Sequence, residues 1–287
     1  MTNLEIDEEK WDQIILPKAR LFDINLKELW RYRDLILLFV KRDFSAQFKQ
    51  TVLGPLWHVI QPVFTTIMFL FIFSKVAKIP TDGINPILFY MSGITIWNYF
   101  SLSLTATSNT FVSNANIFGK VYFPRLVLPI STIISNIIKF AIQFGLLLIV
   151  MIYFGIKNKE FYLSFSWLLV PVLVLLMAGL GLGLGIIISS LTTKYRDLTV
   201  LITFGVQLLM YATPVAYPMS YLRGTSMGNI IAWNPLSPVI EGFRYSIFGV
   251  GEFDVNGLIY STLFTVIILI TGIIVFNRVE KNFMDTV

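Results

Sequence analysis

Apolar stretches of about membrane-spanning length recur along this chain, and they constrain its fold more than any other feature. A helix needs roughly 20 apolar residues to cross the hydrocarbon core of a bilayer. Stretches of about this length are Trp57–Phe73, Ile87–Ala106, Ile130–Phe154, Trp167–Leu191, Thr199–Tyr217 and Val255–Phe276. The chain is 55% hydrophobic and only 14% charged, a balance that a soluble domain of this length would not show. The sequence therefore predicts an all-α polytopic membrane protein with six transmembrane helices.

The sequence also excludes several kinds of site. With no cysteine and one histidine, it offers neither a thiolate metal site nor a histidine cluster. It contains no G-x-x-x-x-G-K-[ST] pattern, so it is not itself a P-loop ATPase. Gly181 and Gly185 form a G-x-x-x-G inside an apolar run, which is typical of close helix packing and not of phosphate binding. We expect no cofactor, no metal and no nucleic-acid partner for this chain, and no cleavable signal peptide, since no apolar run lies near Met1.

The first part of the chain, residues 1–56, is predicted to lie outside the membrane, before a transmembrane domain of residues 57–287. Between Leu26 and Gln50, apolar residues recur at spacings of three and four, while Lys and Arg occupy other faces. This pattern predicts an amphipathic helix in the plane of the interface. A span beginning at Leu35 is excluded because Lys41, Arg42 and Asp43 interrupt it.

The placement of Lys and Arg predicts the orientation of the spans. Most of them lie in the N-terminal region, at Lys120 and Arg125, at Lys194 and Arg196, and after the last span. Cytoplasmic flanks carry the excess of basic residues in multi-pass membrane proteins. With an even number of spans, we therefore expect both termini in the cytosol.

The loop between the second and third predicted spans, around residues 109–129, carries apolar and aromatic residues at roughly helical spacing. They are Ile117, Phe118, Val121, Tyr122 and Phe123. Pro124 and Pro129 follow and would set the entry angle of the next span. We predict a short helix at the cytosolic membrane surface. Either a soluble partner docks on it or it buries its rings among lipid headgroups, and the spacing fits both.

Two short apolar pieces lie between the fifth and sixth predicted spans, Gly228–Trp233 and Pro238–Phe248. At about 1.5 Å per residue, neither can cross the membrane. Pro214 and Pro218 break the fifth span just before them. We therefore predict external re-entrant helices, in preference to helices that rest on the outer leaflet.

Some residues inside the predicted spans are candidates for transport. Lys139 lies about ten residues into the third span, where an ionisable group is either functional or directed back to the headgroups. Aromatic residues are more numerous than interfacial belts require, so they either line a path for sugar rings or pack the core. Carboxylates are nearly absent from the spans, which disfavours ion-coupled transport and a membrane-embedded transferase.

Several motifs in combination carry a resemblance to a known family. They are ELWRYRDLILLFVKRDFSAQFKQTVLGPLWHVIQP from Glu28, IFGKVYFPRLVLP from Ile117, KYRDL from Lys194, TPVAYP from Thr213 and NPLSPVIEGFRYSIFG from Asn234. Together they resemble the permease subunit of ABC-2 type exporters of lipid-linked polysaccharides such as O-antigen, capsule and teichoic acid. The resemblance covers nearly the whole chain after about Ile24.

The resemblance implies a homodimer in the bacterial cytoplasmic membrane, served by two copies of a separate ATPase subunit that binds ATP and Mg. A channel at the dimer interface would carry an undecaprenyl-type lipid-linked glycan. The basic residues of the amphipathic helix, Lys27, Arg31, Arg33, Arg42 and Lys49, would either attract the pyrophosphate of that lipid or serve only as topological anchors. An exporter of a drug or small lipid, a membrane-embedded transferase and a lone channel stay as alternatives.

The same resemblance, together with the patterns above, gives a set of candidate site residues. ATPase coupling is assigned to Asn116, Ile117, Phe118, Lys120, Tyr122, Phe123 and Arg125. The cytosolic interface is assigned to Arg42, Asp43, Lys49, Leu53, Gly54, Tyr195, Arg196 and Asp197. The channel or lateral gate is assigned to Phe64, Phe69, Trp97, Lys139, Phe204 and Tyr211, and the external gate to Pro214, Asn234, Pro235 and Arg244.

Overall fold

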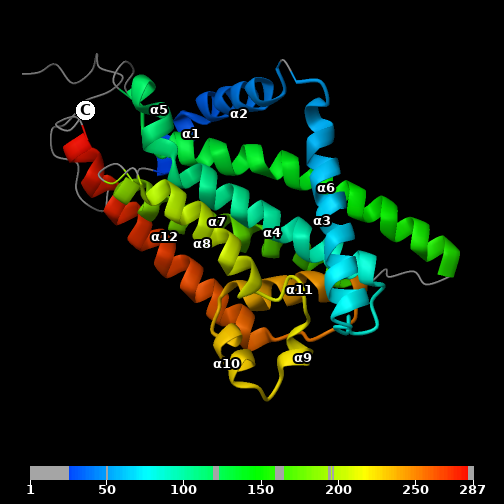
Figure 1. Ribbon diagram of the computed structural model, residues 1–287. Coiled ribbons are helices and arrows are strands. Elements are labelled where there is room, and N and C mark those ends of the chain that lie inside the picture. Colours follow the sequence, from blue (N-terminus) through cyan, green and yellow to red (C-terminus); the bar gives the residue numbers. More distant parts are fainter. Residues whose placement is uncertain are drawn as a thin grey trace, which may run out of the picture.

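The computed structural model describes residues 26–49, 51–118, 123–158, 165–192, 195 and 197–283, and within these ranges it is helical without a strand (Figure 1). The helices are α1 (Leu26–Arg31), α2 (Arg33–Phe48), η2 (Gly54–Leu56), α3 (Trp57–Phe69), η3 (Leu70–Val76), α4 (Pro86–Ser108), α5 (Thr110–Phe118), α6 (Val127–Asn158), η4 (Phe165–Leu169), α7 (Val170–Thr192), α8 (Leu198–Tyr211), α9 (Met219–Leu222), α10 (Ser226–Ala232), α11 (Leu236–Phe248) and α12 (Val255–Phe283). The predicted all-α class is confirmed.

Within the described residues, 5 helical stretches are long and apolar enough to cross a membrane. They are Gly54–Val76, Pro86–Ser108, Val127–Lys157, Phe165–Thr192 and Val255–Arg278. Each contains one of the predicted spans, and each extends a few residues beyond it at one or both ends. The first of them joins α3 to η3, a π-helical stretch.

The remaining predicted span, Thr199–Tyr217, is shorter in the structure than the sequence suggested. Its helix, α8, has 14 residues, which gives a length of about 21 Å against a hydrocarbon core of roughly 30 Å. The helix ends at Tyr211 because Pro214 lacks the backbone N–H that would continue the ladder and its ring collides with the preceding turn.

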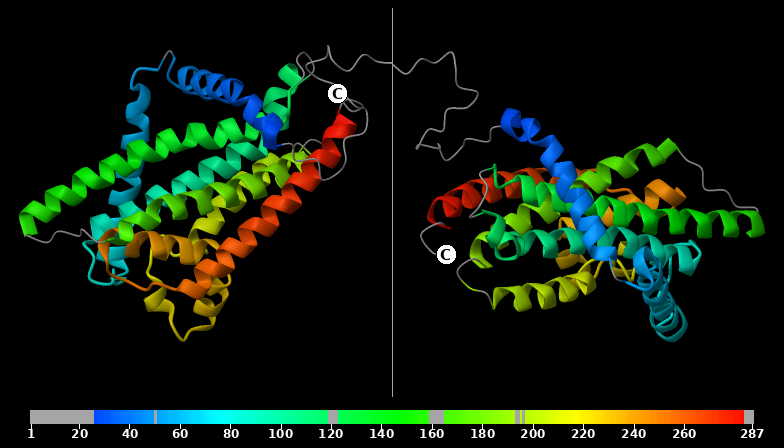
Figure 2. Two further views of the ribbon diagram at one scale, coloured as in Figure 1. Left: turned by 180° about the vertical axis from the view of Figure 1, so that it is seen from behind. Right: turned by 90° about the horizontal axis from the view of Figure 1, so that it is seen from above.

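Helix α4 forms the centre of the bundle and contacts α3, α6, α7, α8 and α11. Its aromatic side chains Phe89, Tyr90, Tyr99 and Phe100 are fully buried. Figure 1 and the right-hand view of Figure 2 show α3 and α8 on one face of the bundle, on either side of α4. The core is therefore built within a single subunit, around α4.

Glycines on two sides of α7 allow close approach of its neighbours. A Cβ atom at Gly181 would lie 2.9 Å from Cβ of Ser103, and one at Gly185 would lie 2.6 Å from Cβ of Thr107, both on α4. Gly179 and Gly183 face α12 in the same way. The prediction that Gly181 and Gly185 serve helix packing is confirmed.

We expect Gly185→Leu to destabilise the protein by about 1–3 kcal/mol or more, because the added side chain must separate α4 from α7. The measurement is the thermal unfolding midpoint of the purified protein in detergent. Gly205→Leu is the matched control, since a Cβ atom at Gly205 on α8 meets nothing within 4 Å. Equal midpoints for the two variants would show that the close approach of α4 and α7 does not depend on Gly185.

The predicted amphipathic helix from Leu26 to Gln50 is divided in the structure into α1 and α2. The break lies at Tyr32, with φ −90° and ψ 15°, beside Arg33, where the apolar pattern has a gap. Helix α2 contacts α6 and lies across one end of the bundle, with Phe39 and Val40 buried beneath it (Figure 1). Its placement in the plane of the membrane interface stays a prediction.

The two ends of the bundle differ in construction. Helices α2 and α5 lie at one end, called here the α5 end, and α9 and α10 lie at the other, with α11 beside them, called here the α11 end (Figures 1 and 2). Helix α11 is buried along almost its whole length against α4, α7, η4 and α12. Its re-entrant placement in the membrane stays a prediction. Helix α10 is mostly exposed, so the two apolar pieces that the sequence treated alike have different surroundings.

Candidate functional site

The predicted coupling region contains α5, a short helix that begins directly after α4. Thr192 at the end of α7 donates a hydrogen bond from Oγ1 to the carbonyl of Ser108 (3.0 Å), and the amide of Phe111 donates to Oγ of Ser189 (3.4 Å). Asn114 has non-helical angles, φ −118° and ψ 17°, and its Nδ2 donates to the carbonyl of Thr110 (3.0 Å). Helix α5 is therefore kinked, and its first turn is tied to the end of α7.

A compact apolar cluster holds this region to the bundle. It consists of Phe39, Phe111, Phe123, Val127, Leu128, Ile186 and Phe276, and is called here the anchor cluster. Phe111 stacks on Phe276 of α12 at 4.6 Å between ring centroids and 21° between planes. Phe123 packs against Phe39 of α2 at 5.8 Å. One cluster thus joins α2, α5, α6, α7 and α12, so a displacement of α5 would be transmitted to several helices at once.

The predicted coupling residues do not all occupy one helix face. Ile117 is half-buried against the anchor cluster, and Phe123 is buried in it, beyond the end of α5. Arg125 is half-buried just before α6. The side chains of Asn116 and Phe118, and the whole of Lys120 and Tyr122, lie outside the described residues. Phe123 is thus a packing residue and not an exposed docking residue in this structure.

The predicted interface residues at the α5 end lie in three places. On α2, Arg42 binds Asp43 through Nη2 (2.7 Å) and Nε (2.9 Å), and its guanidinium carbon lies 4.6 Å from the centre of the Phe39 ring. Lys49 caps the end of α2 and is exposed. Leu53 and Gly54 are half-buried before α3, and the positive φ of Gly54, +48°, suits a glycine at this turn. Tyr195 and Asp197 are exposed before α8, and Arg196 lies outside the described residues.

The predicted channel residues separate into exposed and buried groups. Phe64 on α3 is 65% exposed and Phe204 on α8 is 59% exposed, and Tyr211 on α8 is exposed as well. These three lie on the two helices that share one face of the bundle (Figures 1 and 2). Phe69 and Trp97 belong to the core of the single subunit. The side chains of Phe64, Phe204 and Tyr211 are therefore available at the surface for a channel or a partner. Those of Phe69 and Trp97 are buried and are not available.

At the α11 end, Asn234 connects α11 to the end of α8. Its Oδ1 accepts a hydrogen bond from the amide of Leu236 (3.0 Å), the first residue of α11. Its Nδ2 donates to the carbonyl of Ala212 (2.9 Å) and to Oγ1 of Thr213 (3.1 Å). Pro214 is buried beside this junction, and the carbonyl of Pro235 accepts a hydrogen bond from Ser261 of α12 (2.7 Å). Three of the predicted external-gate residues therefore meet at one junction.

Arg244, the fourth predicted external-gate residue, is buried in the middle of α11 with 1% of its surface exposed. Its Nη1 donates to Oε1 of Glu241 (3.0 Å) and its Nη2 to the carbonyl of Val215 (2.6 Å). Its guanidinium carbon lies 3.7 Å from the centre of the Phe89 ring on α4. A Cβ atom at Gly93 would lie 2.6 Å from Nη2, so only glycine leaves room for the guanidinium there.

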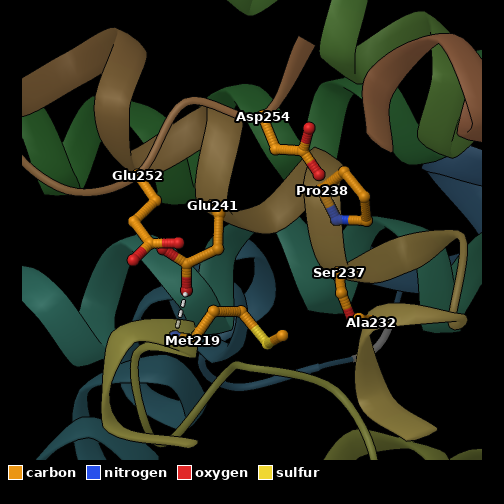
Figure 3. A pocket seen from close by; sticks show the side chains of 7 residues that line it. All are labelled: Met219, Ala232, Ser237, Pro238, Glu241, Glu252 and Asp254. Carbon is orange, nitrogen blue, oxygen red and sulfur yellow. Dashed lines mark hydrogen bonds between the residues drawn. The ribbon is translucent and has the colours of Figure 1, made fainter. Parts of the chain in front are cut away.

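The carboxylates around a small open pocket at the α11 end are held by other groups (Figure 3). Glu241 binds Arg244 and accepts the amide of Met219 (3.3 Å), Glu252 binds Arg223 (2.8 Å), and Asp254 accepts the amide of Gly257 (3.0 Å). Burial raises the pKa of the Glu241 carboxyl, and the charge of Arg244 opposes that shift. Each acid has a structural partner, and among the described residues no group of His, Asp and Glu is arranged to hold a metal ion.

Sequence reasoning assigned no site role to Glu241, Gly93, Phe111 and Phe276. Glu241 and Arg244 lie three residues apart in an apolar segment, a spacing that places both on one helix face and could have indicated the pair. The anchor cluster has no such local signal, because its members come from parts of the chain that are far apart.

The fold and these sites define a multi-pass helical membrane protein with a short helix anchored at one end and a buried charged pair at the other. Residues 34–248 match the ABC-2 type transporter family, and the chain belongs to that family. It is 28% identical over 254 residues to the O-antigen export system permease protein RfbA of Klebsiella pneumoniae, which covers 88% of this chain and 94% of that protein. It is 25% identical over 264 residues to the protein of the same name from Myxococcus xanthus, which covers 91% of this chain and 98% of that protein.

Proposed function

We propose that this chain is the transmembrane subunit of an ATP-driven exporter that moves lipid-linked polysaccharide across the bacterial cytoplasmic membrane. The observation that carries the proposal is the similarity, along nearly the whole chain, to O-antigen export permeases. ATP hydrolysis belongs to a separate partner subunit, because this sequence contains no P-loop. The working unit is a homodimer with two copies of that partner.

In this proposal the α5 end faces the cytosol, in accord with the placement of Lys and Arg. The chain crosses the membrane a further time through α8 and the buried segment after it. Thr199 near the start of α8 donates a hydrogen bond to Oδ1 of Asn109 at the end of α4 (3.2 Å), and the carbonyl of Val215 meets Arg244 beside Gly93, near the other end of α4. The segment therefore follows α4 over most of its length, which supports a sixth crossing and termini on one side.

The exposed face formed by α3 and α8 is the surface that we assign to the second copy and to the cargo path. Phe64, Phe204 and Tyr211 present aromatic rings there, and such rings can stack on sugars while they also pack in an apolar setting. The charged cargo lipid would approach this face from the α5 end, past the exposed basic residues of α2.

The experiment that tests the cargo is deletion of this chain in its native cell, followed by extraction of lipid-linked glycans. Loss of export predicts accumulation of glycan on its lipid carrier on the cytosolic side. Normal surface glycan together with a lost efflux of a drug or small lipid would overturn the proposal in favour of a different ABC-2 exporter. Copurification of an ATPase subunit tests the assembly independently.

We expect Phe118→Glu to reduce export about tenfold or more while membrane insertion is unchanged, because central apolar anchors of a docking surface typically contribute 2 kcal/mol or more. The measurement is export rate at matched protein level, with ATP hydrolysis recorded in parallel. Phe165→Glu, at the exposed first residue of η4, is the control and should export normally. Normal export by Phe118→Glu would show that this part of α5 does not bind the motor.

A further inference from the structure

Lys139 lies where three helices meet at the α5 end. It is a half-buried residue of α6, a helix that contacts both α2 and α3. Its ammonium interacts electrostatically with Asp43 of α2 and with His58 of α3. The ring of His58 also packs edge-on against Phe48 of α2 at 5.5 Å, so His58 lies between α2 and α6. We call this position the Lys139 corner.

Two polar groups of this corner, the Lys139 ammonium and Nε2 of His58, have no hydrogen-bond partner among the described residues. Among the described residues, no hydrogen bond or ion pair engages the Lys139 ammonium. Nε2 of His58 is buried and has no hydrogen-bond partner. The nearby carboxylate of Asp43 is already held by Arg42 in two contacts, at 2.7 and 2.9 Å. A polar group that is buried without a hydrogen-bond partner destabilises a fold, so this arrangement points to an acceptor supplied from outside the chain.

The chemistry of the corner selects an anion with several oxygens. An ammonium carries three donors, and an imidazole can present a further donor at Nε2. A phosphate group satisfies both at once through charge-assisted hydrogen bonds. The corner lies where the first span enters the bilayer, because His58 is the second residue of α3 and directly follows Trp57, which is exposed as interfacial tryptophans are. Phosphates at this depth are those of lipid headgroups.

We propose that Lys139 and His58 form a binding site for a lipid-borne phosphate group at the corner of α2, α3 and α6. The exposed Lys41 and Lys49 of α2 would raise the local concentration of anionic lipid around it. The existence of the site does not depend on the proposed function. The further statement that the phosphate is that of the isoprenoid pyrophosphate carrying the glycan rests on it.

The test is lipid binding by the full-length chain in detergent, measured by native mass spectrometry. The probes are undecaprenyl pyrophosphate, phosphatidylglycerol and, as a phosphate-free control, diacylglycerol. We expect Lys139→Gln and His58→Gln each to weaken binding of the phosphate lipids by about tenfold or more, the usual range for a hydrogen bond to a charged group. Lys139→Arg keeps the charge and should retain binding. Lys41→Gln, at an exposed residue of α2, should change affinity only a few-fold.

The outcomes separate the two sources of phosphate. If the variants lose binding of undecaprenyl pyrophosphate only, the site belongs to the carrier lipid of the cargo. If they lose binding of phosphatidylglycerol equally, the site belongs to an ordinary anionic phospholipid. Unchanged binding of both phosphate lipids by folded Lys139→Gln and His58→Gln overturns the site. If Lys139→Gln does not fold, His58→Gln and Lys139→Arg still decide the question. Weaker binding of the phosphate lipids by both variants, together with normal glycan export in cells that lack this chain, would count against the proposed function and not against the site.

Discussion

Arg244→Met is expected to destabilise the protein by about 3–5 kcal/mol, because it leaves the carboxylate of Glu241 buried without its charge partner. The two side chains are 2% and 8% exposed and lie 3.0 Å apart. The guanidinium also binds the carbonyl of Val215 and lies on the Phe89 ring, so its loss releases α11 from α4 and from the segment after α8. The measurement is unfolding of the purified protein in mixed micelles, with the thermal midpoint as a second readout.

The same end of the molecule provides a matched control. Arg223 and Glu252 form an ion pair of 2.8 Å, but the Arg223 side chain is 76% exposed. Arg223→Met should therefore change stability by less than about 1 kcal/mol. The double variant Arg244→Met with Glu241→Gln should recover part of the loss, since no charge is then left buried. Equal effects of Arg223→Met and Arg244→Met would contradict the role assigned to burial.

The loss of unfolding free energy in Arg244→Met should depend on pH in a defined direction. Burial raises the pKa of Glu241, and the variant lacks the guanidinium that opposes this shift. A carboxyl whose pKa is higher in the folded than in the unfolded protein contributes stability at low pH that is lost as pH rises through its folded pKa. The difference in unfolding free energy between the variant and the unaltered protein should therefore grow as pH increases from acid toward neutral. A difference in unfolding free energy that shrinks over that pH range would contradict the role assigned to Arg244 as the charge partner of Glu241.

The spans were predictable because the signal for them is local. A run of about 20 apolar residues identifies a membrane helix from composition alone, and each of the long spans contains its predicted stretch. The length of α8 could not be predicted in the same way, because it depends on where Pro214 and the contacts of Asn234 end the helix. Both residues were visible in the sequence, but their effect on α8 follows from how α11 packs against the bundle.

The candidate site was predictable only in part, for a physical reason. Membrane helices are apolar on all sides, so periodicity does not distinguish a face toward lipid from a face toward protein. Phe64 and Phe69 on α3 therefore looked equivalent in the sequence, whereas one is exposed and the other buried. The same applies to Phe123, whose helical spacing with Ile117 suggested one docking surface. In the structure it lies beyond α5, in contact with Phe39.

Phe111→Ala is expected to have the second large effect, a loss of about 3–5 kcal/mol of stability together with a loss of coupling. Phe111 is fully buried at the start of α5 and stacks on Phe276 of α12. Removing the ring leaves a cavity between α5 and α12. Packed interiors transmit displacement because they contain few voids, so a push on α5 by a motor would be absorbed there. The measurement is glycan export alongside ATP hydrolysis in the same membranes.

We expect Phe111→Ala to export glycan several-fold more slowly while the rate of ATP hydrolysis is unchanged. Helix α5 is still present to bind the motor, but its connection to the bundle is loosened. Phe204→Ala removes the same side chain from an exposed position on α8 and should leave the thermal midpoint nearly unchanged. Export and hydrolysis falling together in Phe111→Ala would place its defect in motor binding. Normal export at the reduced stability would show that the force does not pass through the contact of Phe111 with Phe276.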